Sequence, residues 1–271
     1  MPADLRPLLE HLPAWLMVLC RLTGIFLLAP VFGSTALLRQ VKIFLVLGLS
    51  FCVYPMLLDP GRPSAGLLGP LVGADLSMWS LGGAMGLELL IGFAIGYGAS
   101  LPLIAMQMGG QLIDQQVFPG SAGVFNPDLG EQSTVVGEMF FITALAVFVI
   151  LGGHRVMLMT LVGSFDHFPP GGFTQFESLL MLILGLLTTT FEIGLRIAAP
   201  LLCLIFLQTL AMGFIARTVP GINILSIGFA VRSVMGAAVL MLSMGVIIEI
   251  YTDGVYTMMR QLFGAFAGGD K

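Results

Sequence analysis

The stretch 81–104, LGGAMGLELLIGFAIGYGASLPLI, carries a single charged residue, Glu88, in an otherwise apolar run. About 20 such residues are enough for a helix to cross the hydrocarbon core of a bilayer. Small residues four apart let two helix backbones approach closely, and glycines in this stretch recur at that spacing: Gly82 with Gly86, and Gly92 with Gly96. The spacing favours close packing over the general abundance of glycine in membrane helices. We therefore expect a long apolar helix that packs tightly against another.

Similar apolar runs recur along the whole chain. The run 179–215 is too long for one crossing, so we expect two helices there, broken between Glu192 and Pro200. No stretch carries a credible strand pattern. The sequence predicts an all-α protein of about six to seven long helices arranged as hairpins in one domain, 1–271. The expected helices are 12–32, 41–58, 81–104, 135–151, 179–215 (as two) and 227–251.

The composition indicates a protein that buries most of its outer surface. Of its 271 residues, 57% are hydrophobic and 10% are charged, and the mean hydropathy is +1.01. A soluble domain has about a quarter charged residues. We expect an integral membrane protein; the alternative is a subunit enclosed by partners in a large assembly. The net charge of −4 argues against nucleic-acid binding, which needs a clustered basic surface.

The segment 106–134, MQMGGQLIDQQVFPGSAGVFNPDLGEQST, interrupts the apolar pattern. It contains neither Lys nor Arg, and Pro119 and Pro127 disfavour helix around them. Irregular backbone at membrane depth survives only where it is buried in protein or lines a cavity. We expect a long loop here. From its chemistry alone, a pore plug and an ordinary solvent-facing connection are equally favoured.

Charged residues inside apolar helices are functional candidates because each is costly unless it is paired or hydrated. Glu192 and Arg196 are four apart, so they share a helix face, and an internal salt bridge is favoured over a transport role. Glu88 has no partner nearby in the sequence, which leaves an intersubunit hydrogen bond or a proton-coupled site. The full set is Arg21, Glu88, Glu138, Glu192, Arg196, Arg232 and Glu249.

Signatures of catalysis and of metal binding are not found in the sequence. His154 and His167 lack the spacing of a zinc motif, and there is neither a nucleophile elbow nor a P-loop. Cys20, Cys52 and Cys203 each lie in an apolar run, so we interpret them as small buried hydrophobes. We predict no catalytic residue, no cofactor and no metal.

Five stretches together resemble the FliR (SctT-type) family of flagellar and type III secretion export gates. They cover most of the chain: ELLIGFAIGYG at 88–98, MGGQLIDQQ at 108–116, FNP at 125–127, GGHRVMLMTLVGSF at 152–165 and ARTVPGINILSIGF at 216–229. The last is the most specific. The residues that follow it, Ala230–Arg232, depart from the proline and lysine of the family pattern.

The resemblance implies a non-enzymatic subunit that joins FliP-like and FliQ-like subunits in a helical funnel. Unfolded flagellar proteins would leave through this funnel, with FlhB-like and FlhA-like subunits beside it. It also implies a place at the bacterial inner membrane, in contact with membrane lipid, within the flagellar basal body, where the complex sits largely raised out of the bilayer plane. The same role in a virulence-type injectisome is an alternative. The competing classes are a secondary transporter with Glu88 as its coupling residue and a purely structural membrane anchor.

Two sets of site residues follow from this reading. The family's pore plug matches Phe118, Pro119, Gly120, Ser121, Ala122, Gly123, Val124, Phe125 and Asn126. The predicted buried polar or subunit-contact residues are Glu88, Glu192, Arg196 and Arg217.

Overall fold

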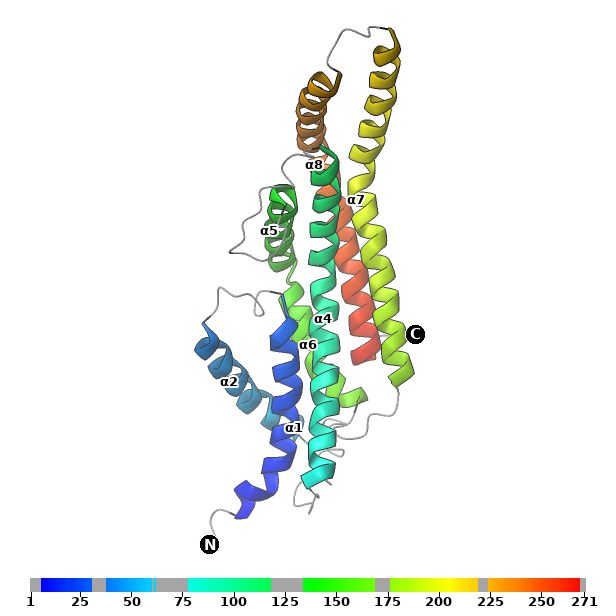
Figure 1. Ribbon diagram of the computed structural model, residues 1–271. Helices are drawn as coiled ribbons and strands as arrows, with labels where there is room; N and C mark the ends of the chain where they lie inside the picture. Colours follow the sequence, from blue (N-terminus) through cyan, green and yellow to red (C-terminus); the bar gives the residue numbers. More distant parts are fainter. Residues whose placement is uncertain are drawn as a thin grey trace. The chain divides into compact units, whose positions relative to one another are not determined.

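The computed structural model describes residues 6–30, 38–59, 61, 78–117, 134–168, 176–218 and 224–268. Within these ranges the chain forms seven α-helices and no strand, which confirms the all-α fold class (Figure 1). Five of the helices are long and apolar enough to cross a membrane, and there are six such spans if one bent pair of helices is counted as a single span. The helices are α1 (Arg6–Leu28), α2 (Arg39–Leu57), α4 (Met78–Val117), α5 (Val135–Ile150), α6 (Gly153–His167), α7 (Phe176–Thr218) and α8 (Ile224–Ala267).

Helix α4 continues to Val117, so the loop predicted from residue 106 is wrong over 106–117. Met106, Ile113 and Val117 lie on one helical face and are no more than 1% exposed. Packing of this face stabilises the helix against the two glycines in the same segment. The rest of the predicted loop up to residue 133, with the proposed plug 118–126, lies outside the described residues.

Helix α7 is one continuous helix with Pro200 inside it, so the predicted break into two helices is wrong. A proline in a helix removes one backbone hydrogen bond, which packing on both sides can offset. Ile197, Ala198 and Leu201 flank this proline and are fully buried.

Helix α6 replaces a predicted connection, and α8 continues well beyond the predicted end at residue 251. Gly152 has a φ of +73°, a left-handed conformation that favours glycine and separates α5 from α6. Beyond it, Met157, Leu161 and Phe165 recur every four residues and are buried, which gives α6 an apolar face. The expected helices left residues 152–178 as a connection, so this helix was missed.

Two compact units make up the chain. Unit 1 comprises Met1–Leu101, Leu151–Leu186 and Thr257–Lys271, and unit 2 comprises Pro102–Ile150 and Leu187–Tyr256. Helices α4, α7 and α8 contribute residues to both units.

In unit 1, α1 packs against α4 through glycines. A Cβ at Gly92 would overlap the carbonyl oxygen of Arg21, and one at Gly96 would lie 2.7 Å from the carbonyl oxygen of Ile25. The predicted close approach of two backbones is therefore confirmed at Gly92 and Gly96. At Gly82 and Gly86 a Cβ would meet nothing within 4 Å, so this second pair makes no close helix contact within the described residues.

In unit 2, α5, α7 and α8 are joined by polar side chains in addition to apolar packing. The Tyr251 hydroxyl of α8 donates a hydrogen bond to the Ala144 carbonyl of α5, at 3.1 Å. Arg232 of α8 donates to the Thr209 hydroxyl of α7, at 2.9 Å. Such bonds fix how neighbouring apolar helices are rotated against each other.

Candidate functional site: a buried ion pair

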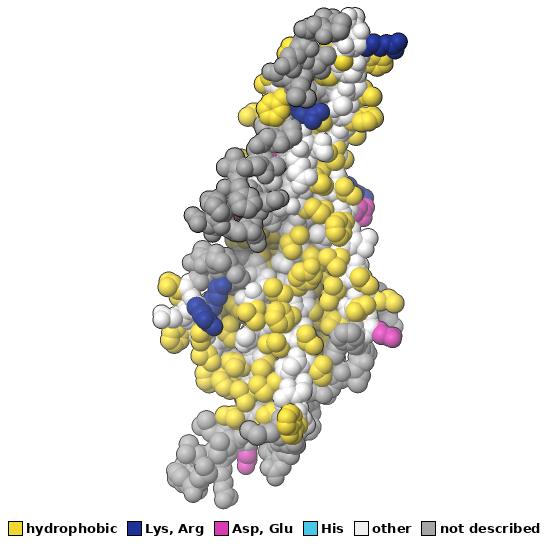
Figure 2. Space-filling model, in the orientation of Figure 1, with side chains coloured by type: hydrophobic (Ala, Val, Ile, Leu, Met, Phe, Trp, Pro, Cys, Tyr) yellow, Lys and Arg dark blue, Asp and Glu magenta, His cyan; other side chains and the backbone are white. Residues whose placement is uncertain are grey.

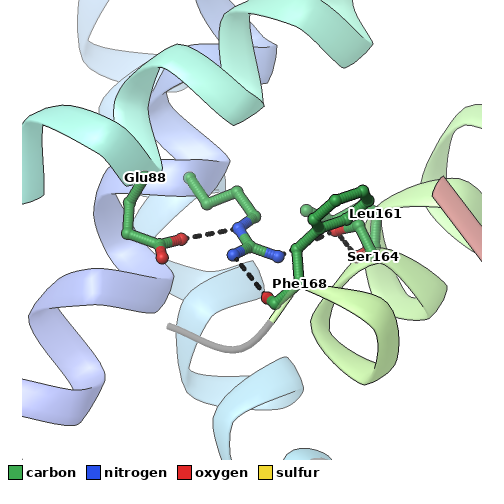
Figure 3. Close-up of polar contacts among 5 residues, drawn as sticks. Glu88, Leu161, Ser164 and Phe168 are labelled. Carbon is green, nitrogen blue, oxygen red and sulfur yellow. Dashed lines mark hydrogen bonds and ion pairs between the residues drawn. The ribbon is translucent and has the colours of Figure 1, made fainter. Parts of the chain in front are cut away.

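A buried ion pair in unit 1 joins Arg21 of α1 to Glu88 of α4 (Figure 3). The Arg21 Nε atom donates to Glu88 Oε2 at 2.6 Å, and the two side chains are 0% and 1% exposed. The glycine contact of Gly92 with the Arg21 backbone explains this placement, because it brings the two helices close enough for the side chains to meet. A buried charge is tolerated where it is paired and hydrogen-bonded, as both are here.

The other two guanidinium nitrogens of Arg21 contact α6 and the residue that follows it. Nη1 donates to the Ser164 hydroxyl and Nη2 to the Phe168 carbonyl, each at 3.0 Å. The Ser164 hydroxyl in turn donates to the Leu161 carbonyl at 2.6 Å. The guanidinium also lies over the Phe165 ring, 4.0 Å from its centroid, where the ring face attracts a cation. Arg21 therefore fastens α1, α4 and α6 together.

The chemistry of this site is that of a structural clamp. Every nitrogen of the guanidinium donates to an oxygen of the same chain, and the Phe165 ring covers one face of the group. A bidentate or forked guanidinium holds its partners in a defined geometry, which a lysine at the same position could not do.

The sequence singled out both charges but did not pair them, because 67 residues separate them. Glu88 was expected to contact another subunit or to couple to protons. The structure places its carboxylate against Arg21 of the same chain, so neither role is needed to satisfy its charge. Ser164 was missed because it was assigned to a connection; its place seven residues after Met157 and three after Leu161, on the apolar face of α6, was the available signal.

The predicted pair on α7 forms. Arg196 Nη2 donates to Glu192 Oε1 at 2.6 Å, which confirms the predicted salt bridge. This chain by itself does not bury the pair, since the Arg196 and Glu192 side chains are 65% and 56% exposed. Arg217, in the last turn of α7, is exposed as well. The chain leaves this side of α7 uncovered, so contact with another subunit stays a prediction for all three residues.

Within the part of the chain that the structure describes, no three His, Cys, Asp or Glu side chains lie close enough together to hold a metal ion. Cys20 is half-buried, whereas Cys52 and Cys203 are exposed. The predicted burial is therefore wrong for the last two, which lie on helix faces that this chain does not cover.

Apolar side chains dominate the outer faces of α7 and α8. In the most apolar window of each helix, 28% of α7 and 11% of α8 is buried inside the chain, against 67% of α4. Figure 2 shows hydrophobic side chains over much of the visible face, with only scattered charges between them. Exposed apolar surface on this scale marks contact with lipid or with other proteins.

The sequence matches the family described as bacterial export proteins, family 1, over residues 12–258. The chain belongs to this family. The predicted resemblance to FliR and SctT-type subunits is thereby confirmed. Two stretches that carried it, 88–98 and 152–165, meet at the ion pair of Arg21, because they contribute Glu88 and Ser164.

Relatives of this export protein are named for flagellar biosynthesis, for the translocation of Yop proteins and for a secretion system. It is 26% identical to the flagellar biosynthetic protein FliR of Bacillus subtilis (strain 168) over 250 residues, which cover 90% of each chain. It is 27% identical over 230 residues to the Yop proteins translocation protein T of Yersinia pestis, covering 83% of this chain and 82% of that one. With the secretion system apparatus protein SsaT of Salmonella typhimurium, identity is 25% over 180 residues, 65% of this chain and 70% of the relative.

Proposed function

We propose that this chain is a non-enzymatic subunit of a bacterial type III protein export gate. Together with FliP-like and FliQ-like subunits it forms the channel for unfolded flagellar proteins, next to FlhB-like and FlhA-like subunits in the inner membrane. The observation that carries the proposal is the family match over 12–258, with relatives named for flagellar biosynthesis and for secretion.

The exposed ion pair on α7 supports assembly with other subunits. A charged side chain in the hydrocarbon of a bilayer is costly, so such residues face protein or water. Glu192 and Arg196 lie near the middle of α7 and are more than half exposed in this chain. Around them Phe191 and Leu195 are 58% and 54% exposed, which gives this part of α7 a mixed apolar and charged surface. Such a surface suits a partner subunit better than a lipid tail.

We further propose that residues 118–126 close the channel until export begins. Phe118 and Phe125 flank small residues in this segment, and we expect their two apolar side chains to exclude water from the closed channel. The segment directly follows α4, whose last residue Val117 is 1% exposed and therefore held firmly by the packed helix.

The flagellar assignment rests on the ARTVPGINI motif at 216–224. Identities of 26% to a flagellar relative and 27% to an injectisome relative are too similar to decide it. Co-expression with flagellar FliP-like and FliQ-like subunits, compared with their injectisome counterparts, would separate the two assignments.

Co-purification with FliP-like and FliQ-like subunits tests the gate. A gate subunit should be recovered in a stoichiometric complex, and without partners or detergent it should aggregate because of the uncovered faces of α7 and α8. A stable, monodisperse protein that binds a small solute and ignores these partners would instead support a transporter.

Deletion of 120–123 in the assembled complex tests the plug separately. The expected result is a rise in ion leakage across the membrane with the complex still intact. Unchanged leakage would exclude the plug and leave the gate assignment standing. Replacement of Phe118 and Phe125 by serine should raise leakage in the same direction, whereas a purely structural anchor would tolerate both changes.

A further inference from the structure

One face of α7 in unit 2 is not covered by the described part of the chain. The opposite face of the helix packs closely against two neighbours. A Cβ at Gly109 of α4 would lie 2.8 Å from the Ile197 side chain, and a Cβ at Gly254 of α8 would lie 2.6 Å from that of Ile193. Phe206 lies on the other side of α7 from these contacts and is 64% exposed. The helix therefore has one packed face and one open face.

Exposed residues recur along the open face at the spacing of a helix–helix contact. Each is three or four residues from the next, so they are neighbours in one line on the helix surface. In the middle of the line, Ala199 and Cys203 are small and four residues apart, a spacing that lets a second backbone approach closely. We call this line the α7 seam; its members are Glu192, Leu195, Ala199, Cys203 and Phe206.

Pro200 leaves one backbone oxygen beside the seam without its usual donor. In a regular helix the N–H of residue 200 donates to the carbonyl of residue 196, and proline has no N–H. Arg196 and Pro200 are both exposed, so this carbonyl lies on the open side of α7. No side chain of the described residues donates a hydrogen bond to it. An apolar surface with such an acceptor is unfavourable unless a donor from outside the chain covers it.

The ion pair at the same level also has unused hydrogen-bonding groups. Arg196 donates through Nη2 to Glu192 Oε1 at 2.6 Å. Within the described residues, its other two guanidinium nitrogens and the Glu192 Oε2 atom have no partner. The pair is neutral as a whole, so another charge buried against it would be uncompensated, whereas a neutral polar side chain would not. The seam therefore suits a neutral group that donates a hydrogen bond.

We propose that the α7 seam docks an apolar helix of a partner subunit that carries Ser, Thr, Asn or Gln at the level of Pro200. The backbone of this helix would lie over Ala199 and Cys203, and its polar side chain would donate to the Arg196 carbonyl. A lipid tail has no hydrogen-bond donor, so lipid at this face would leave the carbonyl unpaired. The inference rests on the proposed assembly with partner subunits and names the chemistry of one contact in it.

Pro200→Ala separates docking from folding. Alanine restores the N–H, so the Arg196 carbonyl is paired within α7. The isolated chain should then be at least as stable in detergent, because proline is the least favourable residue inside a helix. Recovery in the complex with FliP-like and FliQ-like subunits should nevertheless fall about five-fold, the factor that corresponds to one hydrogen bond of about 1 kcal/mol. The matched control is Pro55→Ala, at an exposed proline inside α2, and it should leave recovery unchanged.

Ala199→Leu tests the close approach at the centre of the seam. Because Ala199 is exposed, the stability of the isolated chain should not change. Recovery of the complex should fall at least ten-fold, since the larger side chain keeps the two backbones apart. The matched control, Ala211→Leu, makes the same change at an exposed residue of α7 that lies roughly 120° around the helix, and it should have no such effect.

A photocrosslink identifies what covers the seam. Phe206→p-benzoylphenylalanine keeps an aromatic side chain at the end of the seam, where the residue is exposed. Irradiation of the assembled complex should join it to a peptide of a partner subunit whose apolar run contains Ser, Thr, Asn or Gln. An adduct with lipid or detergent alone, or with a peptide that has none of these residues, would overturn the proposal.

The recovery measurements distinguish this contact from the assembly as a whole. If the unchanged chain forms the complex but Pro200→Ala or Ala199→Leu is recovered equally well, the docking proposal is wrong and the assembly stands. Equal losses in the two controls would also overturn it, because the effect would then not depend on the seam. If the unchanged chain forms no complex at all, the proposed assembly fails and the docking proposal fails with it.

Discussion

The buried pair of Arg21 and Glu88 makes a sharp prediction about stability. In Glu88→Ala, the guanidinium stays buried with the Ser164 hydroxyl, the Phe168 carbonyl and the Phe165 ring as its remaining partners. Removing one partner of a buried ion pair costs about 3–5 kcal/mol, because the other charge is left uncompensated. Since two hydrogen bonds and the ring remain, we expect a loss near the lower limit, about 3 kcal/mol.

Two further variants separate charge from packing. Glu88→Gln keeps an oxygen that can accept from Arg21 Nε, so we expect a smaller loss of about 1–2 kcal/mol. The double variant Arg21→Met with Glu88→Leu removes both charges and keeps apolar volume, and replacing a whole buried pair in this way is often neutral or stabilising. The double variant should therefore be more stable than either single charge deletion.

The assay is equilibrium unfolding of the purified full-length protein in detergent, followed by circular dichroism. A double-mutant cycle of Arg21→Met and Glu88→Leu should give a coupling free energy of at least about 3 kcal/mol, the top of the range for residues in direct contact, because the double change should cost less than either single change. If the stability losses of the two single variants add up to the loss of the double variant, the two charges are not coupled and the structural clamp is refuted. A loss below about 0.5 kcal/mol in Glu88→Ala would do the same, because surface changes have effects of that size.

Three further predictions use the same unfolding measurement. Gly92→Ala should destabilise the protein by about 1–3 kcal/mol, because the new Cβ overlaps the backbone of α1. In the control variant Gly86→Ala the new Cβ meets open space, so this change should be neutral or stabilising by up to about 1 kcal/mol. Equal losses of stability at both sites would contradict the close helix contact. Tyr251→Phe removes the buried hydrogen bond between α8 and α5 and should cost about 1 kcal/mol; no change would mean that the hydroxyl finds an equivalent partner when the protein unfolds. Glu192→Gln should change the stability of the isolated chain by less than about 0.5 kcal/mol, since its ion pair with Arg196 is exposed and spans one helical turn. The same change should lower the recovery of the chain in the complex with FliP-like and FliQ-like subunits. Unchanged recovery would show that no partner subunit contacts this pair.

Several features were determined by the sequence alone because they depend on spacing along one helix. The apolar runs identified the all-α class, since a segment without charges has no stable place in water and satisfies its backbone internally only as a helix. The four-residue spacing of Glu192 and Arg196 predicted their salt bridge, which any helix would allow. The spacing of Gly92 and Gly96 likewise predicted a close helix contact, although it could not name α1 as the neighbour.

The tertiary structure decided what depends on contacts between segments far apart in the chain. Arg21 and Glu88 meet because glycines bring α1 and α4 together, and nothing in either local sequence specifies the other's position. The glycines and polar residues of 106–117 indicated a loop, and only the burial of Ile113 and Val117 against other helices makes that segment helical. Helix propensity is a sum of small local terms, whereas burial of a whole apolar face is larger and depends on partners that local sequence cannot identify.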